Sequence, residues 1–376
     1  MPDPRVPVSN RFLITARRHV LRQGASDHLS GLESLLSDGR LTSGRSAKAL
    51  SFASLVVATF LACGLIPLLS AWATEIPRDW QREWPNTDFS RLSVSAREII
   101  GGGPPRDGIP PINKPLFISA NDMRSLADQD PVISVVVGDI AHAYPLRILI
   151  WHEIVNDVVN GRSVAVTYCP LCNAAIVFDR KVDEQVLTFG TTGKLRNSDL
   201  IMYDKESESW WQQFTGASIA GEMVGRELLV IPSRLESWAR FKSRHPDGKV
   251  LLPNDLNLRP YGSNPYIGYE QSKVPFLYKG PYPKGIKPMQ RVVVVGEKAW
   301  SLDRLRKERT LDDGDLILEW HPEQASALDK KEISEGVDVG DVVVQRRIGD
   351  KLVDVPHAVT FAFVYFAFNN NSEIVL

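Results

Sequence analysis

The chain has 376 residues, of which 43% are hydrophobic and 24% are charged, and its formal net charge is −1 at pH 7. A chain of this length holds about two domains and has ample apolar material for a core. The near-zero charge and the lack of a dense Lys/Arg run in the body exclude the nucleic-acid-binding class, whose affinity depends on neutralising phosphates.

Residues 1–48 show no sustained apolar periodicity and are predicted to be a cytoplasmic or disordered segment. An uncharged stretch, residues 49–74, follows and exceeds the roughly 20 residues that cross a bilayer. Lys and Arg outnumber Asp and Glu before it, which keeps that flank in the cytoplasm. The stretch is either a signal peptide, cleaved after the small-x-small pattern Ala71-Trp72-Ala73, or an uncleaved single-pass anchor. Both alternatives predict an extracytoplasmic body, periplasmic or secreted, from Glu75 onwards.

The body is predicted to consist of two β-rich halves. Its division is a Pro/Gly-rich lead-in (75–130), a first half with a Cys-x-x-Cys motif (131–252), a connecting loop (253–289) and a second half (290–376). The lead-in up to Leu116 contains Gly101-Gly102-Gly103-Pro104-Pro105 and is expected to drape over the body as a loop.

Cys169-Pro170-Leu171-Cys172 contains the only closely spaced cysteines of the chain. Two runs rich in β-branched residues, Ser163–Tyr168 and Ala174–Phe178, flank the motif. Such runs favour strands, so the motif is predicted to lie on a tight bend between two strands, with both sulfurs facing one point.

Upstream, Asn160-Gly161 is a dipeptide preferred by two-residue type I′ hairpin turns, in which both residues have positive φ. With this pair as the loop, the predicted register places His152 opposite Cys169 and Glu153 opposite Tyr168. Directly opposed residues have Cβ atoms about 4.5–5.5 Å apart. The register would therefore bring an imidazole to the two thiols.

The same stretch also fits a helix. Ile148, Trp151, Val155 and Val158 recur at helical spacing. A continuous helix would remove the pairing and point His152 away from Cys169.

Further strands are predicted beyond the bend, at Val186–Phe189, Leu200–Tyr203 and Leu228–Ile231. Glu236–Arg244 is predicted to be a short helix capped by Ser233.

The second half echoes the first. Residues 134–141 (SVVVGDIA) resemble 292–299 (VVVVGEKA), and Tyr168-Cys169-Pro170 falls near Trp320-His321-Pro322. These matches favour an internal duplication, with chance similarity between β-rich segments as the alternative. In a duplication His321 and Gln324 correspond to the two cysteines, and the second copy, without a dithiol, becomes a structural partner.

The chemistry of the Cys-x-x-Cys depends on its setting. A disulfide closing so short a loop stabilises a fold by only about 2 kcal/mol in the chain-entropy model. In glutaredoxin-type Cys-Pro-x-Cys motifs a helix N-terminus lowers the thiol pKa, whereas a strand is predicted to follow here. A bend between strands instead resembles a metal knuckle, and two thiolates with an imidazole suit copper or zinc. The expected metal ligands are therefore Cys169, Cys172, His152 and Glu153.

Other motifs are given structural interpretations. A four-cysteine site is excluded because Cys63 lies in the apolar stretch, and haem attachment because Asn173 follows Cys172. The remaining candidates are expected to be a packing patch (Trp210-Trp211-Gln212-Gln213), a solvated or ion-paired polar stretch with an anion site as its alternative (Thr191–Asp199), and two structural histidines (His142 and His357).

Four phrases, AYPLRILIWHEIVND, VAVTYCPLCNAAIVFDR, FGTTGKLRNSDLIMYD and SWWQQFTG, closely resemble the bacterial domain-of-unknown-function family numbered 3179. The resemblance covers roughly Gly101–Phe368 and implies a secreted or envelope-exposed protein. It matches His152, Glu153, Cys169 and Cys172 to the WHE and TYCPLCN signatures, and it implies no reaction.

The sequence thus predicts an extracytoplasmic α+β protein, β-rich, of two related halves with few short helices. The expected function is binding of a thiophilic metal, copper or zinc. The alternatives are a periplasmic thiol-disulfide oxidoreductase that uses Cys169 and Cys172, and a non-catalytic envelope scaffold with a small disulfide. The expected partners are an envelope protein or metal donor, and the membrane through residues 49–74 if they are not cleaved.

Overall fold

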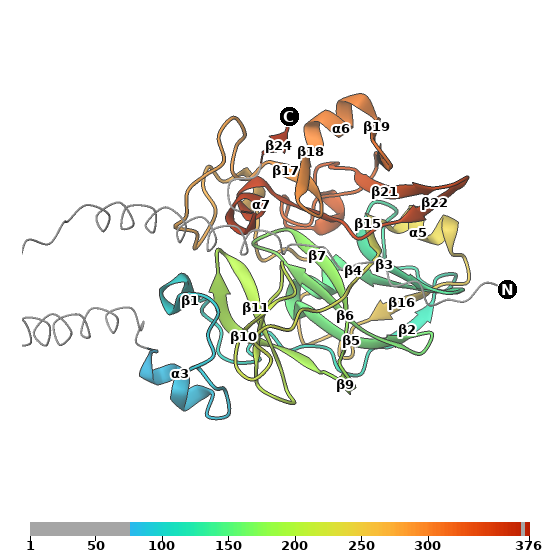
Figure 1. Cartoon of the computed structure of the whole chain (residues 1–376). Helices are drawn as coiled ribbons and strands as arrows, with labels where there is room; N and C mark the ends of the chain where they lie inside the picture. Colours follow the sequence, from blue (N-terminus) through green and yellow to red (C-terminus); the bar gives the residue numbers. More distant parts are fainter. Residues whose placement is uncertain (1–75, 370–372) are drawn as a thin grey trace, which may run out of the picture. The chain divides into compact units, whose positions relative to one another are not determined.

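The computed structural model describes residues 76–369 and 373–376, which form a β-rich α+β fold as the sequence predicts (Figure 1). The helices in these residues are short: α3 (Arg78–Glu83), α4 (Leu146–His152), α5 (Trp238–Arg244), α6 (Leu302–Glu308) and α7 (Ala362–Phe368), with 3-10 turns η2 (Ala96–Glu98), η3 (Tyr269–Gln271) and η4 (Ile333–Glu335).

The strands of residues 99–252 form three main sheets. The sheet ordered β15-β3-β4-β16-β2 contains β2 (Leu116–Ser119), β3 (Pro131–Val137), β4 (Ile140–Pro145), β15 (Ser233–Ser237) and β16 (Lys249–Leu252). The sheet ordered β14-β7-β6-β5 contains β5 (Ile154–Val159), β6 (Arg162–Cys169), β7 (Ala174–Asp179) and β14 (Val230–Ile231). The sheet ordered β1-β10-β11-β12-β13 contains β1 (Ile99–Gly101), β10 (Phe189–Arg196), β11 (Asp199–Asp204), β12 (Trp210–Gln212) and β13 (Ser218–Ala220); β8 (Lys181–Val182) and β9 (Gln185–Val186) pair separately.

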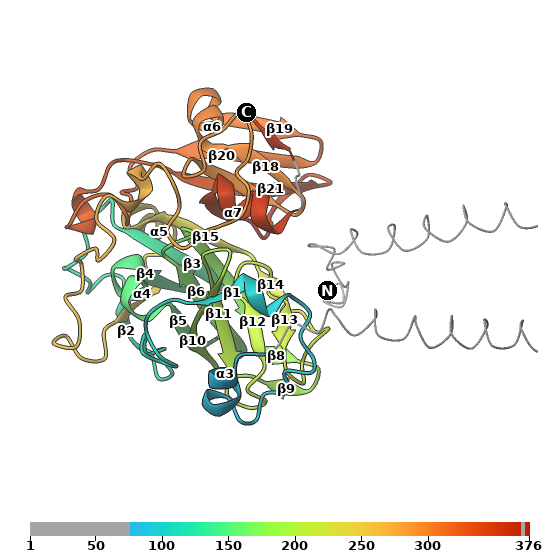
Figure 2. The ribbon, with the colours of Figure 1, turned by 90° about the vertical axis from the view of Figure 1, so that its left-hand side faces the viewer.

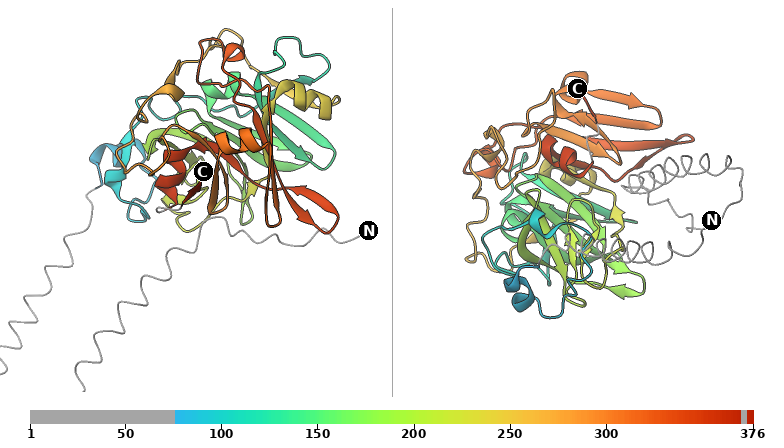
Figure 3. Two further views of the ribbon diagram at one scale, coloured as in Figure 1. Left: turned by 90° about the horizontal axis from the view of Figure 1, so that it is seen from above. Right: turned by 60° about the vertical axis from the view of Figure 1, so that its left-hand side comes forward.

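Two further sheets are built from residues 291–375. One, ordered β23-β17-β18-β24, contains β17 (Arg291–Val295), β18 (Lys298–Ser301), β23 (Ala358–Phe361) and β24 (Ile374–Val375). The other, ordered β19-β20-β21-β22, contains β19 (Thr310–Asp313), β20 (Leu316–His321), β21 (Asp341–Ile348) and β22 (Lys351–Asp354). Figure 2 and the right panel of Figure 3 show these sheets in orange and red above the green sheets of the first half.

The two halves share one order of elements. In each, two antiparallel strands lead through a short helix into a three-stranded meander: β3-β4-α4-β5-β6-β7 and β17-β18-α6-β19-β20-β21. Each half then adds a strand, a helix and a parallel strand to its first sheet, β15-α5-β16 in one and β23-α7-β24 in the other. The residue after the first helix has positive φ in both halves, at Glu153 and Arg309.

The predicted hairpin turn and its register are confirmed, but not the pairing at its far end. Asn160 and Gly161 both have positive φ, and Ile154 pairs with Thr167 as the register requires. The ladder stops at Ile154, because α4 occupies the residues before it. His152 therefore belongs to a helix and is not the strand partner of Cys169. Neither a full-length hairpin nor a continuous helix is correct, since the chain changes from helix to strand at Glu153.

Other local predictions differ from the structure mainly at their ends. The helix predicted from Glu236 is α5 and begins at Trp238, because Glu236 lies in β15 and pairs with Val132 of β3. Ser233 is also part of β15, so it does not cap the helix. The lead-in is not all loop, since α3 and β1 form within it.

The main core contains side chains from both halves. Buried residues of β5–β7 pack in one cluster with Phe361, Phe363 and Val364 of β23 and α7. A separate core in the second half surrounds α6 and contains Trp300 and Leu318. The bend that carries the cysteines therefore lies in a core to which the second half contributes.

No helix in the part of the chain that the structure describes is long and apolar enough to cross a membrane. The expected signal peptide or anchor at 49–74, together with Cys63 and the expected segment 1–48, lies outside the described residues.

Candidate metal centre

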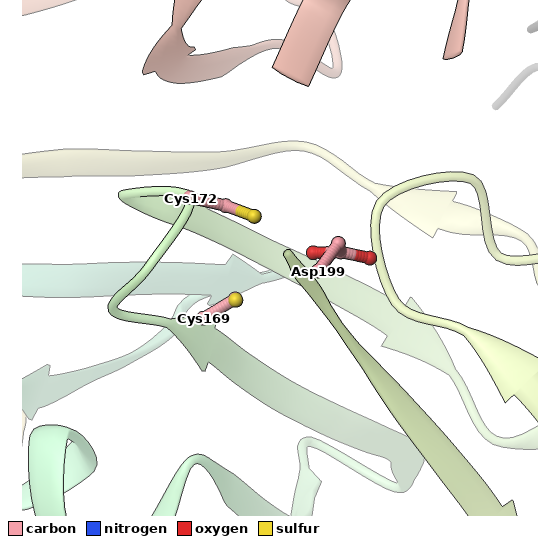
Figure 4. Close-up of side chains that lie close together, drawn as sticks. All are labelled: Cys169, Cys172 and Asp199. Carbon is pink, nitrogen blue, oxygen red and sulfur yellow. The ribbon is translucent and has the colours of Figure 1, made fainter. Parts of the chain in front are cut away.

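The Cys-x-x-Cys lies on the bend between β6 and β7, as predicted. Cys169 is the last residue of β6 and pairs with Ala174, the first residue of β7. The amides of Cys172 and Asn173 donate to the carbonyls of Cys169 and Pro170, each at 3.2 Å. Asn173 closes the bend with φ of 50°, a conformation that asparagine tolerates better than most residues. This tight turn directs both thiols to the same side (Figure 4).

Asp199 completes a group of three possible metal ligands. It is the first residue of β11 and follows Asn197-Ser198, both of which have positive φ. Its carboxylate and the two sulfurs supply ligand atoms that all lie within 4.8 Å of one another. Figure 4 shows the carboxylate facing the two sulfurs. Cys169 is 2% exposed and the other two residues are fully buried, so the group is shielded from solvent.

Both cysteines are free thiols in a low-polarity environment. Each Sγ donates to the carbonyl oxygen of Ser198, over 3.8 Å from Cys169 and 3.5 Å from Cys172. Burial raises the pKa of Cys169 above its usual value and raises that of Cys172 further. Without a cation, the pair is therefore protonated at neutral pH.

The two oxygens of Asp199 have different surroundings. Oδ2 accepts hydrogen bonds from Gln212 Nε2 at 2.7 Å and from the amide of Phe214 at 2.9 Å. Oδ1 is buried and receives no hydrogen bond from a nitrogen or oxygen donor among the described residues. Burial raises the pKa of this carboxyl to about 6. A buried carboxylate oxygen without such a donor, beside two thiols, is a position that a bound cation would satisfy.

Glu153 lies close to this group. Its backbone oxygen accepts from the amide of Tyr168 at 2.8 Å, which fixes the α4–β5 corner against β6. Its side chain is buried, and burial, with a smaller contribution from the charge of Asp199, raises its pKa to about 8. The carboxyl is therefore mostly neutral at pH 7.

His152 is engaged elsewhere. Its Nδ1 is 2.7 Å from the carbonyl oxygen of Pro110, and its Nε2 is 2.8 Å from the hydroxyl of Tyr261. A carbonyl can only accept, so Nδ1 carries the proton and Nε2 accepts from the tyrosine. Burial lowers the pKa of His152, which favours this neutral form. The structure groups Asp199, and not His152, with the two cysteines.

The second half and the connecting loop hold the bend in place. The carbonyl of Cys172 accepts from Thr360 Oγ1 at 2.7 Å and from the amide of Phe361 at 3.2 Å. Tyr269 of the loop donates its hydroxyl to the carbonyl of Leu171 at 3.0 Å. Segments far apart in the sequence thus fix the geometry of both cysteines.

Sequence reasoning missed Asp199, Gln212 and Gln213. Trp210 and Trp211 are buried packing residues as predicted, but Gln212 binds Asp199, and Gln213 Nε2 donates to Thr167 Oγ1 at 2.8 Å. A signal was present, because all three residues lie in phrases that resemble the family. Composition alone gave an acid in a polar stretch no special weight.

The remaining candidates have structural roles. Lys194 pairs with Glu83 at 2.6 Å and Arg196 with Glu98 at 2.7 Å, so the cations of the polar stretch are ion-paired as expected. His142 bonds Asp157 at 3.1 Å, and His357 lies within hydrogen-bonding distance of two backbone carbonyls.

A family model described as a protein of unknown function, DUF3179, matches residues 106–372. The matched span includes the cysteine bend, Asp199 and most of the second half. No curated protein and no solved structure matches the chain.

Proposed function

The chain belongs to the DUF3179 family, and we propose that it binds a thiophilic metal ion, copper or zinc, through Cys169, Cys172 and Asp199. The family description gives no activity, so the proposal depends on the site. The observation that carries it is the buried Oδ1 of Asp199, which has no nitrogen or oxygen donor in the described chain and faces two free thiols.

Metal binding would replace the thiol protons. Thiolates are the form that binds metal, and the buried thiols are protonated in the empty site, so binding would release protons and strengthen as the pH rises. The cation would in turn offset the charge of the thiolates and of Asp199 in a site closed to water.

The number of ligands favours copper over zinc. Structural zinc sites are almost always four-coordinate, whereas soft thiolates select Cu(I) without requiring a full tetrahedral set. Two sulfurs and one carboxylate supply three ligand atoms here. A zinc ion would need a fourth, and the nearby carboxyl of Glu153 is the best placed to supply it. His152 stays a predicted ligand that would first have to release Tyr261.

The redox alternative has less support. Thiol-disulfide exchange requires an accessible thiolate, whereas both cysteines are buried and burial raises their pKa. The strand β7 follows the motif, so no helix N-terminus is present there to stabilise a thiolate. The scaffold alternative requires a disulfide between two cysteines that are free thiols here.

We also propose an extracytoplasmic location and a metal donor as partner. The uncharged stretch 49–74, with its basic flank, supports the location. The enclosed site supports a donor, because burial hinders direct capture of a hydrated ion.

We further infer that the two halves arose by duplication. They share their order of strands and helices, including the parallel closing strand of the first sheet. His321 ends β20 as Cys169 ends β6. In this interpretation the second copy lacks the dithiol, and its strand β23 supports the bend of the first.

The test is metal titration of the full chain, purified in detergent under reducing conditions, in competition with a chromophoric chelator. Stoichiometric Cu(I) binding is expected in the wild type and in Cys63→Ser, the matched control, and its loss in Cys169→Ser and in Cys172→Ser. Glu153→Gln should keep Cu(I) binding and weaken zinc binding. If the wild type binds neither ion more tightly than the double cysteine variant, the metal proposal is wrong, and a thiol count then separates the redox and disulfide alternatives.

A further inference from the structure

Residues 272–288 form a surface segment with an unusual composition. It contains four exposed lysines, Lys273, Lys279, Lys284 and Lys287, and no Asp or Glu. Three of its apolar side chains are also exposed: Val274 by 55%, Phe276 by 58% and Tyr282 by 41%. Large exposed side chains of this kind, interspersed with cations, are typical of a surface that meets a partner.

The C-terminus adds apolar area to the same place. Gly285 lies against Leu376, whose side chain is 58% exposed, and Val375 is 40% exposed. Tyr278 joins the two ends of the segment, because its ring lies 5.8 Å from that of Tyr282. The face is therefore continuous from residue 276 to the C-terminus.

The segment is anchored from below to the cysteine-bearing region. The backbone oxygen of Phe276 accepts a hydrogen bond from Ser198 Oγ, and its amide donates to the Tyr269 hydroxyl at 3.4 Å. Ser198 is also the residue whose carbonyl faces both thiols. The outward side chain of Phe276 has no such internal role.

We propose that residues 272–288, with the C-terminal Val375 and Leu376, dock onto an anionic lipid surface. Lysines and aromatic side chains together suit the interface of such a bilayer: the cations approach lipid phosphates, and the apolar side chains enter the headgroup region. Charge complementarity identifies the surface as anionic, because no acid interrupts the lysines of the segment.

The position of the chain outside the described structure favours a bilayer over a protein as the occupant. The expected membrane stretch ends at residue 74, and α3 begins at Arg78, which leaves only a short tether. Glu83 of α3 binds Lys194 of β10, and the turn after β10 contacts the segment through Ser198. In Figure 1 both α3 and the loop that precedes β17 lie on the left.

The test compares the full chain in bilayer discs of phosphatidylcholine alone with discs that also contain phosphatidylglycerol. The readout is amide hydrogen exchange of residues 272–288. Exchange is expected to slow severalfold in the anionic discs and to return to the phosphatidylcholine rate at high salt, because screening weakens the attraction. This readout does not depend on metal, so its outcome is separate from that of the metal proposal.

Matched variants sharpen the test. Replacing Lys273, Lys279, Lys284 and Lys287 with Ser should remove the protection, whereas replacing Lys205, Lys249, Lys307 and Lys351, exposed lysines elsewhere, should keep it. Phe276→Ser should reduce protection with no change in charge. Equal exchange in both discs, equal loss in the two lysine sets, or protection that depends on protein concentration and not on lipid would overturn the proposal, the last by identifying a second copy as the occupant.

Discussion

Asp199 is the residue that distinguishes this cysteine bend from an ordinary buried pair of thiols. One of its oxygens is held by Gln212 and the amide of Phe214, so the other is oriented towards the sulfurs (Figure 4). An acid in such a place destabilises the empty protein unless it is protonated, since burial raises its pKa to about 6. The cost of keeping it is understandable if a cation binds there.

Asp199→Asn should therefore separate binding from stability. We expect the metal affinity to fall at least about tenfold, because a neutral amide is a poor ligand for the bound ion. The metal-free variant should unfold at the same temperature as wild type or higher, because a buried charge is removed. Chelator competition and thermal unfolding measure the two effects. Asp247→Asn, at an exposed site, is the control, and unchanged affinity in Asp199→Asn would remove this residue from the ligand set.

His152 should matter more for stability than for metal. Truncation to Ala leaves the carbonyl of Pro110 and the hydroxyl of Tyr261 without their partner, at a cost of about 1–3 kcal/mol. Metal affinity should fall less than in either cysteine variant. Urea unfolding and metal titration of His152→Ala, with Tyr261→Phe beside it, test this. A larger loss of affinity in His152→Ala than in Cys169→Ser would restore His152 as a principal ligand.

At the level of elements, the bend depends on a strand from the other half. Strand β23 reaches the carbonyl of Cys172 through Thr360 and Phe361, and Asn173 Nδ2 returns a hydrogen bond to Val359 O at 3.1 Å. These contacts hold the second cysteine while the β6–β7 ladder holds the first. The distance between the sulfurs therefore depends on how β23 meets the bend.

Thr360→Val tests this dependence. The variant keeps the shape of the side chain but removes the donor to Cys172 O, so we expect a loss of about 1–2 kcal/mol of stability and a weaker metal affinity. The exposed Thr310→Val serves as the matched control. Stability measured by urea unfolding that falls without any change in metal affinity would show that β23 supports the fold and not the site.

At the scale of the whole molecule, a buried charge network links the halves. Asp341 of β21 is 1% exposed and lies 3.1 Å from Arg240 of α5, and Arg234 of β15 binds Asp354 of β22 through two contacts of 2.7 Å. Burial raises the pKa of Asp341 to about 7. This contact between the halves is therefore sensitive to pH.

The sign of the effect follows from proton binding. An unfolded aspartate loses its proton near pH 4, whereas folded Asp341 keeps it to about pH 7. Its stabilising contribution is complete below pH 4 and is lost as the pH rises towards 7, on the order of a few kcal/mol. Urea unfolding between pH 4 and 8 should show a shallower decline in Asp341→Asn than in wild type or in Asp247→Asn. Parallel pH profiles of all three proteins would contradict this account.

The sequence by itself determined the features that depend on neighbouring residues. The strands on either side of the cysteines, the bend between them and the turn at Asn160-Gly161 were all predictable, because turn conformation and side-chain alternation are local properties. The register of β5 against β6 followed from the turn.

Only the tertiary structure decided which residues meet the thiols. The register failed to place His152 because Glu153 takes a positive φ and ends the ladder there, a corner that the contact with Tyr168 stabilises. Asp199 joins the site because β11 is brought to the bend by pairing and packing between separate sheets, and Thr360 because β23 packs on it from the second half. Such contacts depend on how elements distant in sequence bury their apolar faces together, and no local pattern of residues contains that information.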